Sequence, residues 1–269
     1  MIEVEDLSVA IGGRTILQGI CFSAAPGTLT AVVGPNGSGK STLMKALCRD
    51  YEYGGAVRLN DRDLAELTPP QAAALRAVLP QASTLPFPFT VHEVVAMGLT
   101  AGRPGLPREM LRRLPADALA AVDLAGFSGR FFGELSGGEQ QRVHLARVLC
   151  QVWVPVLEGV PRYLFLDEPV SSLDIKHQLM IMDVARRFAD AGGGAVAILH
   201  DLNLAAMYAD HMLAIRQGRL VASGPPHAVL TDGLLAAVFD CPMRVGALPP
   251  KGQPFVLPQS AERQMVAIG

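Results

Sequence analysis

The residues best suited to chemistry form one continuous run, Gly34-Pro35-Asn36-Gly37-Ser38-Gly39-Lys40-Ser41, followed by Thr42. The run matches G-x-x-x-x-G-K-[ST], a P-loop. Its glycines keep side chains out of the turn, so that backbone N–H groups and a helix N-terminus can converge on a polyphosphate. By the mechanism of this motif, Lys40 reaches the β- and γ-phosphates and the Ser41 hydroxyl ligates Mg²⁺. The motif therefore predicts a site for a nucleoside triphosphate with Mg²⁺.

Two adjacent carboxylates, Asp167 and Glu168, end the apolar run 163–166. In a parallel sheet, ligands bind at the carboxyl ends of the strands, and successive residues point to opposite sides. We expect Asp167 to support Mg²⁺, directly or through water, and Glu168 to polarise the attacking water. Read alone, the pair could equally be a solvated strand end with helix-start acids. The P-loop upstream favours the functional interpretation.

A third motif is a helix start that contains two glycines, Leu135-Ser136-Gly137-Gly138-Glu139-Gln140. Ser136 and Glu139 have the spacing of a capping box, which by itself predicts only a stable helix start. Glycines in a first turn cost helix stability, roughly 1 kcal/mol each relative to alanine, and so indicate that another group approaches the backbone closely. An exposed helix N-terminus with a serine suits an anion such as a γ-phosphate.

The elements that must position these motifs alternate between short apolar runs and helical stretches. We expect strands at 2–9, 15–22, 29–33, 163–166, 195–199 and 211–216. Short buried strands separated by helices predict a parallel α/β sheet, here entered through a β-rich N-terminal segment. Helical spacing at 91–99, 108–124 and 138–151 predicts an inserted helical subdomain. Residues 153–161 read as a loop, and 227–239 as one last helical stretch before a Pro-rich tail.

Composition restricts the classes of function. The chain of 269 residues is 50% hydrophobic, yet no apolar run reaches the roughly 18 residues that span a bilayer. Its acidic first residues do not resemble a signal peptide, so the cytosol is the expected compartment. The net charge is −2 and the positive residues are dispersed, which argues against a nucleic-acid partner.

The four cysteines, Cys21, Cys48, Cys150 and Cys241, are widely scattered along the chain. They lack the spacing of a zinc site or of a disulfide framework. We therefore expect reduced and mostly buried thiols.

Taken together, the motifs resemble those of the ATP-binding-cassette ATPases and follow that family's order over about residues 2–240. The run 135–140 resembles the signature motif of the family. Gln81 matches the Q-loop glutamine that senses the γ-phosphate and Mg²⁺, and His200 resembles the switch histidine that contacts the γ-phosphate. Without this context, Gln81 would read as a solvated loop residue and His200 as a structural histidine. The resemblance implies ATP hydrolysis with Glu168, His200 and Gln81 as catalytic residues.

The same resemblance implies a fold. It is that of a P-loop NTPase, α/β, with a parallel-sheet core, an N-terminal antiparallel β subdomain and an inserted α-helical subdomain. One ATPase domain would cover 1–240. Its RecA-like core would take about 1–81 and 153–224, and its helical subdomain about 82–152. Residues 225–269 would form a C-terminal helix and tail.

The resemblance also implies an assembly, in which the signature of one copy serves the nucleotide of a second copy. Two chains would then sandwich two ATP molecules. The D-loop of the family is matched by 171–174. The contacts to the partner's ATP would come from Ser136, Gly137, Gly138, Glu139 and Asp174.

The chain departs from the family at two places. No aromatic residue lies in 11–14, where many members stack one on the adenine, which leaves the contact to the base unassigned. Val170 follows Glu168-Pro169 where threonine is usual, a change from which we expect little consequence.

Two stretches, 86–98 and 201–206, resemble the ATPases of the iron-siderophore, cobalamin and heme uptake group. Within that group, 153–161 and 173–178 most resemble the heme importer subunits. This resemblance implies two separate transmembrane permease subunits and, indirectly, a periplasmic substrate-binding protein. The chain would lie at the cytoplasmic face of the bacterial inner membrane. The alternatives are an importer ATPase for ferric siderophore or cobalamin and, in a different class, a soluble cassette ATPase outside transport.

The apolar and aromatic segment 82–95 is the candidate surface for the coupling helices of the membrane subunits. Phe87 and Phe89 could equally belong to the core of the helical subdomain, because isolated apolar residues need no special explanation. Charged substitutions at these two residues distinguish the two interpretations.

Overall fold

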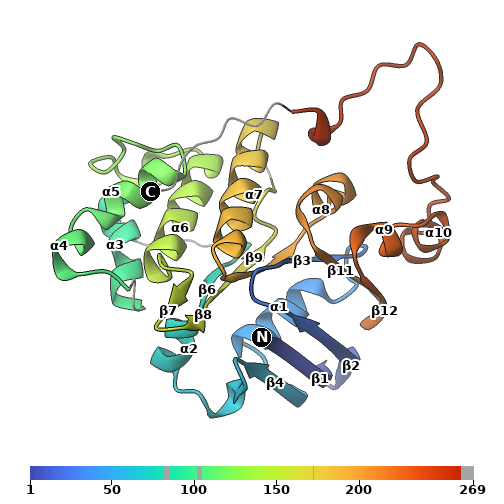
Figure 1. Ribbon diagram of the computed structural model, residues 1–269, viewed down its shortest axis with the longest axis horizontal. Helices are drawn as coiled ribbons and strands as arrows, with labels where there is room; N and C mark the ends of the chain where they lie inside the picture. Colours follow the sequence, from blue (N-terminus) through green and yellow to red (C-terminus); the bar gives the residue numbers. More distant parts are fainter. Residues whose placement is uncertain (82–84, 86, 102–104, 172, 262–269) are drawn as a thin grey trace.

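The computed structural model describes residues 1–81, 85, 87–101, 105–171 and 173–261. Its centre is a six-stranded sheet (Figure 1) in the order β12 (Arg219–Gly224), β11 (His211–Arg216), β3 (Leu29–Val33), β10 (Gly194–Ile198), β9 (Tyr163–Asp167), β6 (Arg76–Leu79). Neighbouring strands pair in parallel except β12, which is antiparallel to β11. Strands β3, β9 and β10 are buried along their whole length, which explains their continuous apolar sequences. Because these three strands are parallel neighbours, the residues that follow them meet at one edge of the sheet.

A second, antiparallel sheet forms the N-terminal part, in the order β2 (Arg14–Ala24), β1 (Ile2–Ile11), β4 (Gly54–Leu59), β5 (Arg62–Asp63). Its inward side chains pack in one core with those of α1 (Lys40–Cys48), the helix after the P-loop. Figure 1 shows this sheet, in blue, beside α1. The predicted β-rich entry into the P-loop is confirmed.

The helical segment consists of α3 (Val91–Ala101), α4 (Arg108–Leu111), α5 (Leu114–Ala121) and α6 (Gly137–Gln151). Figure 1 shows these helices gathered at one side of the central sheet, next to α7 (Ile175–Asp190). Helix α3 approaches α6 very closely, since a Cβ atom built on Gly98 would lie 2.1 Å from the Arg147 carbonyl oxygen. The glycine is what permits this helix crossing.

The remaining elements are short, and they are η1 (Leu64–Glu66), α2 (Pro69–Leu75), η2 (Phe132–Glu134), β7 (Val156–Leu157), β8 (Val160–Pro161), α8 (Leu202–Tyr208), α9 (Pro226–Val229), α10 (Asp232–Phe239) and η3 (Pro258–Ser260). After α10 an extended segment leads back to α8 (Figure 1). There the Gln259 Nε2 atom donates to the Asn203 carbonyl oxygen at 3.1 Å.

Three predicted segments differ from the structure. Residues 153–161 contain the hairpin β7–β8, which turns at Glu158 and Gly159, both with positive φ, as two-residue hairpin turns require. Residues 227–239 form two helices because Thr231 has an extended backbone and caps α10. The stretch 108–124 likewise divides into α4 and α5. The predicted strands at 29–33 and 211–216 have the observed bounds of β3 and β11.

The expectation of mostly buried cysteines is wrong. Cys21, on the outer face of β2, and Cys241, after α10, are exposed, whereas Cys150 is buried. All four thiols are free. Burial raises the pKa of Cys150 and of the half-buried Cys48 to about 12, so these two thiols are inert.

In the part of the chain that the structure describes, no cluster of His, Cys, Asp and Glu could hold a metal ion. Within the same residues, every helix is too short or too polar to cross a membrane.

Candidate functional site

The P-loop connects β3 to α1 through three glycines with positive φ, Gly34 (152°), Gly37 (74°) and Gly39 (107°). A Cβ atom on Gly34 would lie 2.1 Å from the Ile215 carbonyl oxygen. Only glycine fits there, because neither this backbone angle nor this approach tolerates a side chain. The loop thus turns tightly enough to direct the first N–H groups of α1 outward, as an anion site requires.

Lys40, the first residue of α1, folds back over this loop. Its Nζ atom donates to the carbonyl oxygens of Gly34 and Pro35, at 2.9 Å each. Burial lowers the pKa of Lys40, and the charges of Glu168 and Asp167 oppose that effect. The amine therefore lies over the loop with two carboxylates nearby, where it can bind the phosphates of a nucleotide.

Asp167, the last residue of β9, is 5% exposed and faces the start of α1. The Ser41 hydroxyl donates to its Oδ1 atom at 3.5 Å. Burial and the charge of Glu168 raise the pKa of Asp167. A hydroxyl and a desolvated carboxylate form the kind of oxygen donor set that Mg²⁺ prefers, so these residues fit the metal.

Glu168 turns away from Asp167 and is held between two other side chains. Its Oε1 atom lies 2.7 Å from His200 Nε2, and its Oε2 atom accepts from Gln81 Nε2 at 2.8 Å. The backbone of Glu168 is left-handed, with φ of 51°. The two carboxylates face different groups, as predicted, but the cause is the left-handed backbone of Glu168 beyond the end of β9 rather than the alternation of strand residues.

These residues line one cleft of about 490 Å³. The cleft brings together most of the residues predicted to bind ATP within the same chain. Its lining comprises Ile16, Asn36, Gly37, Gly39, Lys40, Ser41, Thr42, Gln81, Glu168 and His200. Gly34, Pro35, Ser38 and Asp167 do not belong to this lining. Ile16, on β2, was missed, because a single apolar residue within a strand pattern gives no functional signal.

The signature-like run forms the start of α6 and has the predicted capping box. The Ser136 N–H and hydroxyl donate to Glu139 Oε2 at 2.8 and 2.7 Å. These bonds, the hydroxyl bond first, lower the pKa of Glu139. A Cβ atom on Gly138 would lie 2.9 Å from Leu173 Cδ2, so the neighbouring chain approaches the helix start closely.

Asp174 caps α7 in a similar way, by accepting the His177 N–H at 2.9 Å. Neither Ser136 nor Asp174 lines the P-loop cleft of the same chain. Ser136 lies at the start of α6 and Asp174 at the start of α7, away from the nucleotide cleft of their own chain. Ser172, in the D-loop-like stretch, lies outside the described residues.

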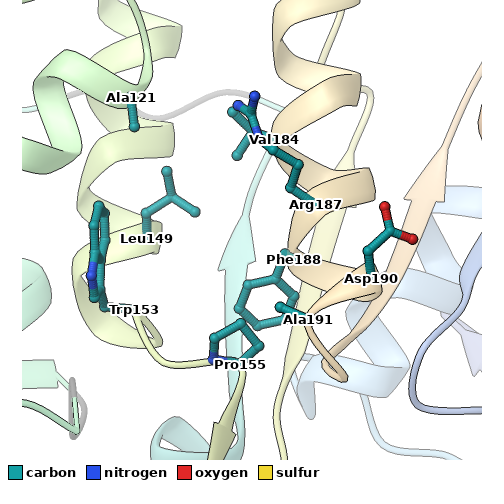
Figure 2. A pocket seen from close by; sticks show the side chains of 9 residues that line it. All are labelled: Ala121, Leu149, Trp153, Pro155, Val184, Arg187, Phe188, Asp190 and Ala191. Atoms are coloured by element: carbon teal, nitrogen blue, oxygen red, sulfur yellow. The ribbon is translucent and has the colours of Figure 1, made fainter. Parts of the chain in front are cut away.

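A second cavity, of about 470 Å³, lies between the ends of α6 and α7. Figure 2 shows Trp153 and Leu149 on one side of it and Phe188 on the other. Both helices present their C-terminal ends here, where the helix dipole disfavours an anion. This apolar cavity is therefore unsuited to a polyphosphate, and the P-loop cleft is the candidate nucleotide site.

Comparison with known protein families agrees with this geometry. The family model described as "ABC transporter" matches residues 17–171, which contain the P-loop, Gln81, the signature-like run and Glu168. The chain belongs to the ABC transporter family. Its fold is the ABC ATPase fold, α/β with an antiparallel β part and helices, as the motifs predicted.

Relatives of this ABC ATPase match over nearly its whole length. The "Hemin import ATP-binding protein HmuV" of Mesorhizobium japonicum is 62% identical, over 97% of this chain and 99% of the relative. The protein of the same name from Chelativorans sp. is 59% identical over the same shares.

Solved structures share the fold. The "Structure of ATP binding subunit of ABC transporter" has a TM-score of 0.76 at 25% identity, covering 89% of this chain and 96% of that chain. An ATP-binding cassette of an ABC transporter in its ADP conformation has a TM-score of 0.73 at 23% identity. It covers 89% of this chain and 98% of that chain. The second likeness concerns the fold alone.

Proposed function

We propose that this chain is the ATP-hydrolysing, energy-coupling subunit of an importer for hemin. The convergence of the P-loop, Gln81, Glu168 and His200 in one cleft carries the proposal of ATP hydrolysis. The relatives named for hemin import, which are 62% and 59% identical, support the cargo.

ATP binds with its phosphates on the P-loop N–H groups, and Lys40 releases the two loop carbonyls to contact the β- and γ-phosphates. Ser41, Gln81 and Asp167, the last directly or through water, would hold Mg²⁺. When bound, the metal supplies positive charge to the phosphate oxygens. Residues 11–14 contain no aromatic ring that could stack on the adenine. Ile16, which lines the cleft, gives the adenine an apolar contact instead.

In the reaction, the oxygen of a water molecule attacks the γ-phosphorus and the bond to the β-phosphate oxygen breaks. Glu168 orients this water and accepts its proton, and ADP leaves. His200 and Gln81 contact the γ-phosphate from either side of Glu168. Because Glu168 contacts both His200 and Gln81 directly, these two contacts must open to admit the phosphate and the water.

The complete site requires a second copy of the chain. Ser136, Gly137, Gly138, Glu139 and Asp174 lie at the starts of α6 and α7, outside the cleft of their own chain. Helix starts favour anions, and the Ser136 hydroxyl, which donates to Glu139 in the single chain, would turn to donate to the phosphate. In a head-to-tail dimer these starts contact the γ-phosphate of the partner's ATP. Closure of the dimer excludes bulk water from the γ-phosphate, and ATP binding thereby drives the two chains toward each other.

The motion acts on two permease subunits and, through them, on a periplasmic substrate-binding protein, at the cytoplasmic face of the bacterial inner membrane. In this proposal the ATPase domain covers 1–240, and its helical subdomain, about 82–152, is inserted into the core of about 1–81 and 153–224. Residues 225–269 form a C-terminal extension. The permease contacts 82–95, of which 82–84 and 86 lie outside the described residues.

Transport in vesicles tests the proposal. The chain is reconstituted with the membrane subunits encoded beside it, and ATP-dependent uptake of hemin, cobalamin and a ferric siderophore is compared. Selective uptake of hemin is expected. Uptake of cobalamin or of the ferric siderophore instead would refute hemin as the cargo and support the role of the chain as an importer subunit. Failure of the chain to associate with membrane subunits would favour a cassette ATPase outside transport.

A further inference from the structure

Helix α6 is fastened to the core at both ends by glutamine side chains. Near its start, Gln141 Nε2 donates to the carbonyl oxygens of Pro169 at 2.7 Å and Glu168 at 3.3 Å. At its last residue, Gln151 Nε2 donates to those of Ala73 at 2.8 Å and Arg76 at 2.9 Å. Each amide uses both of its N–H donors on two backbone acceptors, so each fixes the helix in two directions.

The backbone at Glu168 has a conformation that needs such support. A non-glycine residue with φ of 51° is strained, and strain of this kind persists only where the surroundings fix it. Besides Gln141, the Glu168 carbonyl oxygen accepts from the N–H and the hydroxyl of Ser171, at 3.2 and 3.0 Å. Ser171 belongs to the same turn as Glu168, whereas Gln141 comes from a distant part of the chain.

Gln141 lies five residues after Ser136, about 7.5 Å along the helix axis. Ser136 caps α6 at the end that the proposed dimer presents to the partner's ATP. A displacement of this helix end would therefore move the Gln141 amide and, through its two hydrogen bonds, the backbone that carries the Glu168 carboxylate. The links are one rigid helix and two hydrogen bonds.

We propose that Gln141 is a positioning residue that couples the signature end of α6 to the placement of Glu168. The inference rests on the proposed function, in which Glu168 accepts the proton of the attacking water. Gln141 does not line the cleft. Its effect on turnover passes through the backbone of Glu168, so that docking of the second copy and alignment of the carboxylate are linked.

The experiment compares Gln141→Met with Gln151→Met in the full-length chain, assembled with its membrane subunits in vesicles. Methionine keeps the length of the side chain and removes both donors. The two variants lose the same kind of bond from the same helix, so they are matched in their effect on folding. The measurements are kcat and KM for ATP together with the midpoint of thermal unfolding. Glu168→Gln is included as the reference for loss of the carboxylate.

Gln141→Met is expected to lower kcat about tenfold to a hundredfold, the loss typical of a misplaced catalytic group, and to leave the KM for ATP within twofold. Gln151→Met should keep kcat within twofold, and both variants should unfold at similar temperatures. Equal kcat values for the two methionine variants, beside an inactive Glu168→Gln, would overturn this inference alone. A raised KM with unchanged kcat would also overturn it. Normal turnover in Glu168→Gln would instead remove the proposed role of Glu168, and the inference with it.

Discussion

His200 Nε2 lies 2.7 Å from Glu168 Oε1, at the point where the carboxyl ends of β10 and β9 meet. Gln81, which follows β6, completes the contact by donating to the other carboxylate oxygen. Three strands of one sheet thus deliver three side chains to a single point beside the P-loop. The order β10-β9-β6 brings together residues that are far apart in the sequence.

Lys40→Ala is expected to weaken ATP binding about tenfold to a hundredfold. The substitution removes a charged donor, and a charge-assisted hydrogen bond is worth roughly 1.5–3 kcal/mol. Titration of the purified protein with a fluorescent ATP analogue measures the effect. Lys251→Ala, in the exposed tail, serves as the control for loss of a positive charge. Equal affinities in the two variants would contradict the role of Lys40.

Gly98→Ala should destabilise the protein by about 1–3 kcal/mol, because the added methyl group collides with the backbone of α6. Gly233→Ala is the matched control. Gly233 lies in α10, where a Cβ atom meets nothing within 4 Å, so alanine should stabilise by roughly 0.4–1 kcal/mol. Urea unfolding monitored by Trp153 fluorescence measures both changes. Similar effects of the two substitutions would refute the close contact between α3 and α6.

Phe87 and Phe89 were predicted to be either a docking surface or core, and the structure separates them. The Phe87 side chain is 66% exposed, whereas Phe89 packs against the main core. We expect Phe87→Glu to uncouple ATP hydrolysis from transport in vesicles and to leave unfolding unchanged. Phe89→Glu should destabilise the chain by about 2–4 kcal/mol, since it places a charge in a partly apolar site. Normal coupling in Phe87→Glu would remove this residue from the proposed permease contact.

Acidic pH should remove the stability that Glu139 contributes at the start of α6. Hydrogen bonds from Ser136 hold the pKa of Glu139 below its ordinary value of 4.5. A depressed pKa contributes stability above the unfolded-state pKa, and this contribution is lost as the pH falls through the lower folded value. In Glu139→Gln the side chain still accepts a hydrogen bond but cannot titrate. Its thermal midpoint should therefore fall less than that of the wild type between pH 5 and pH 3. Parallel curves would show that Glu139 makes no such contribution.

The site was largely predictable because its motifs combine residue type with position relative to a strand. Asp167, Glu168 and His200 each lie at or just after the end of a buried apolar run, and the P-loop that ends in Lys40 and Ser41 follows another. Such runs are the easiest strands to recognise. The resemblance of the motifs to the family added Gln81, which has no such signal of its own. The structure places it against Glu168.

What escaped prediction depends on contacts between distant segments. Residues 54–59 and 219–224 gave no strand prediction, yet β4 and β12 form by pairing with β1 and β11. The hairpin at 156–161 depends on two residues with positive φ, one of them a glutamate. Ile16 and Gln141 have ordinary residue types for a strand and a helix, and only the folded chain brings them to the cleft lining and to the Glu168 backbone.

Phosphate release and hemin uptake, recorded together in vesicles for the wild type and for Glu168→Gln, test whether hydrolysis at Glu168 drives transport. The wild type should hydrolyse ATP and accumulate hemin. Glu168→Gln should still bind ATP, remain in a closed dimer, and lose both turnover and uptake by at least a hundredfold, because the water has no proton acceptor. Unchanged phosphate release in Glu168→Gln would contradict the proposed mechanism.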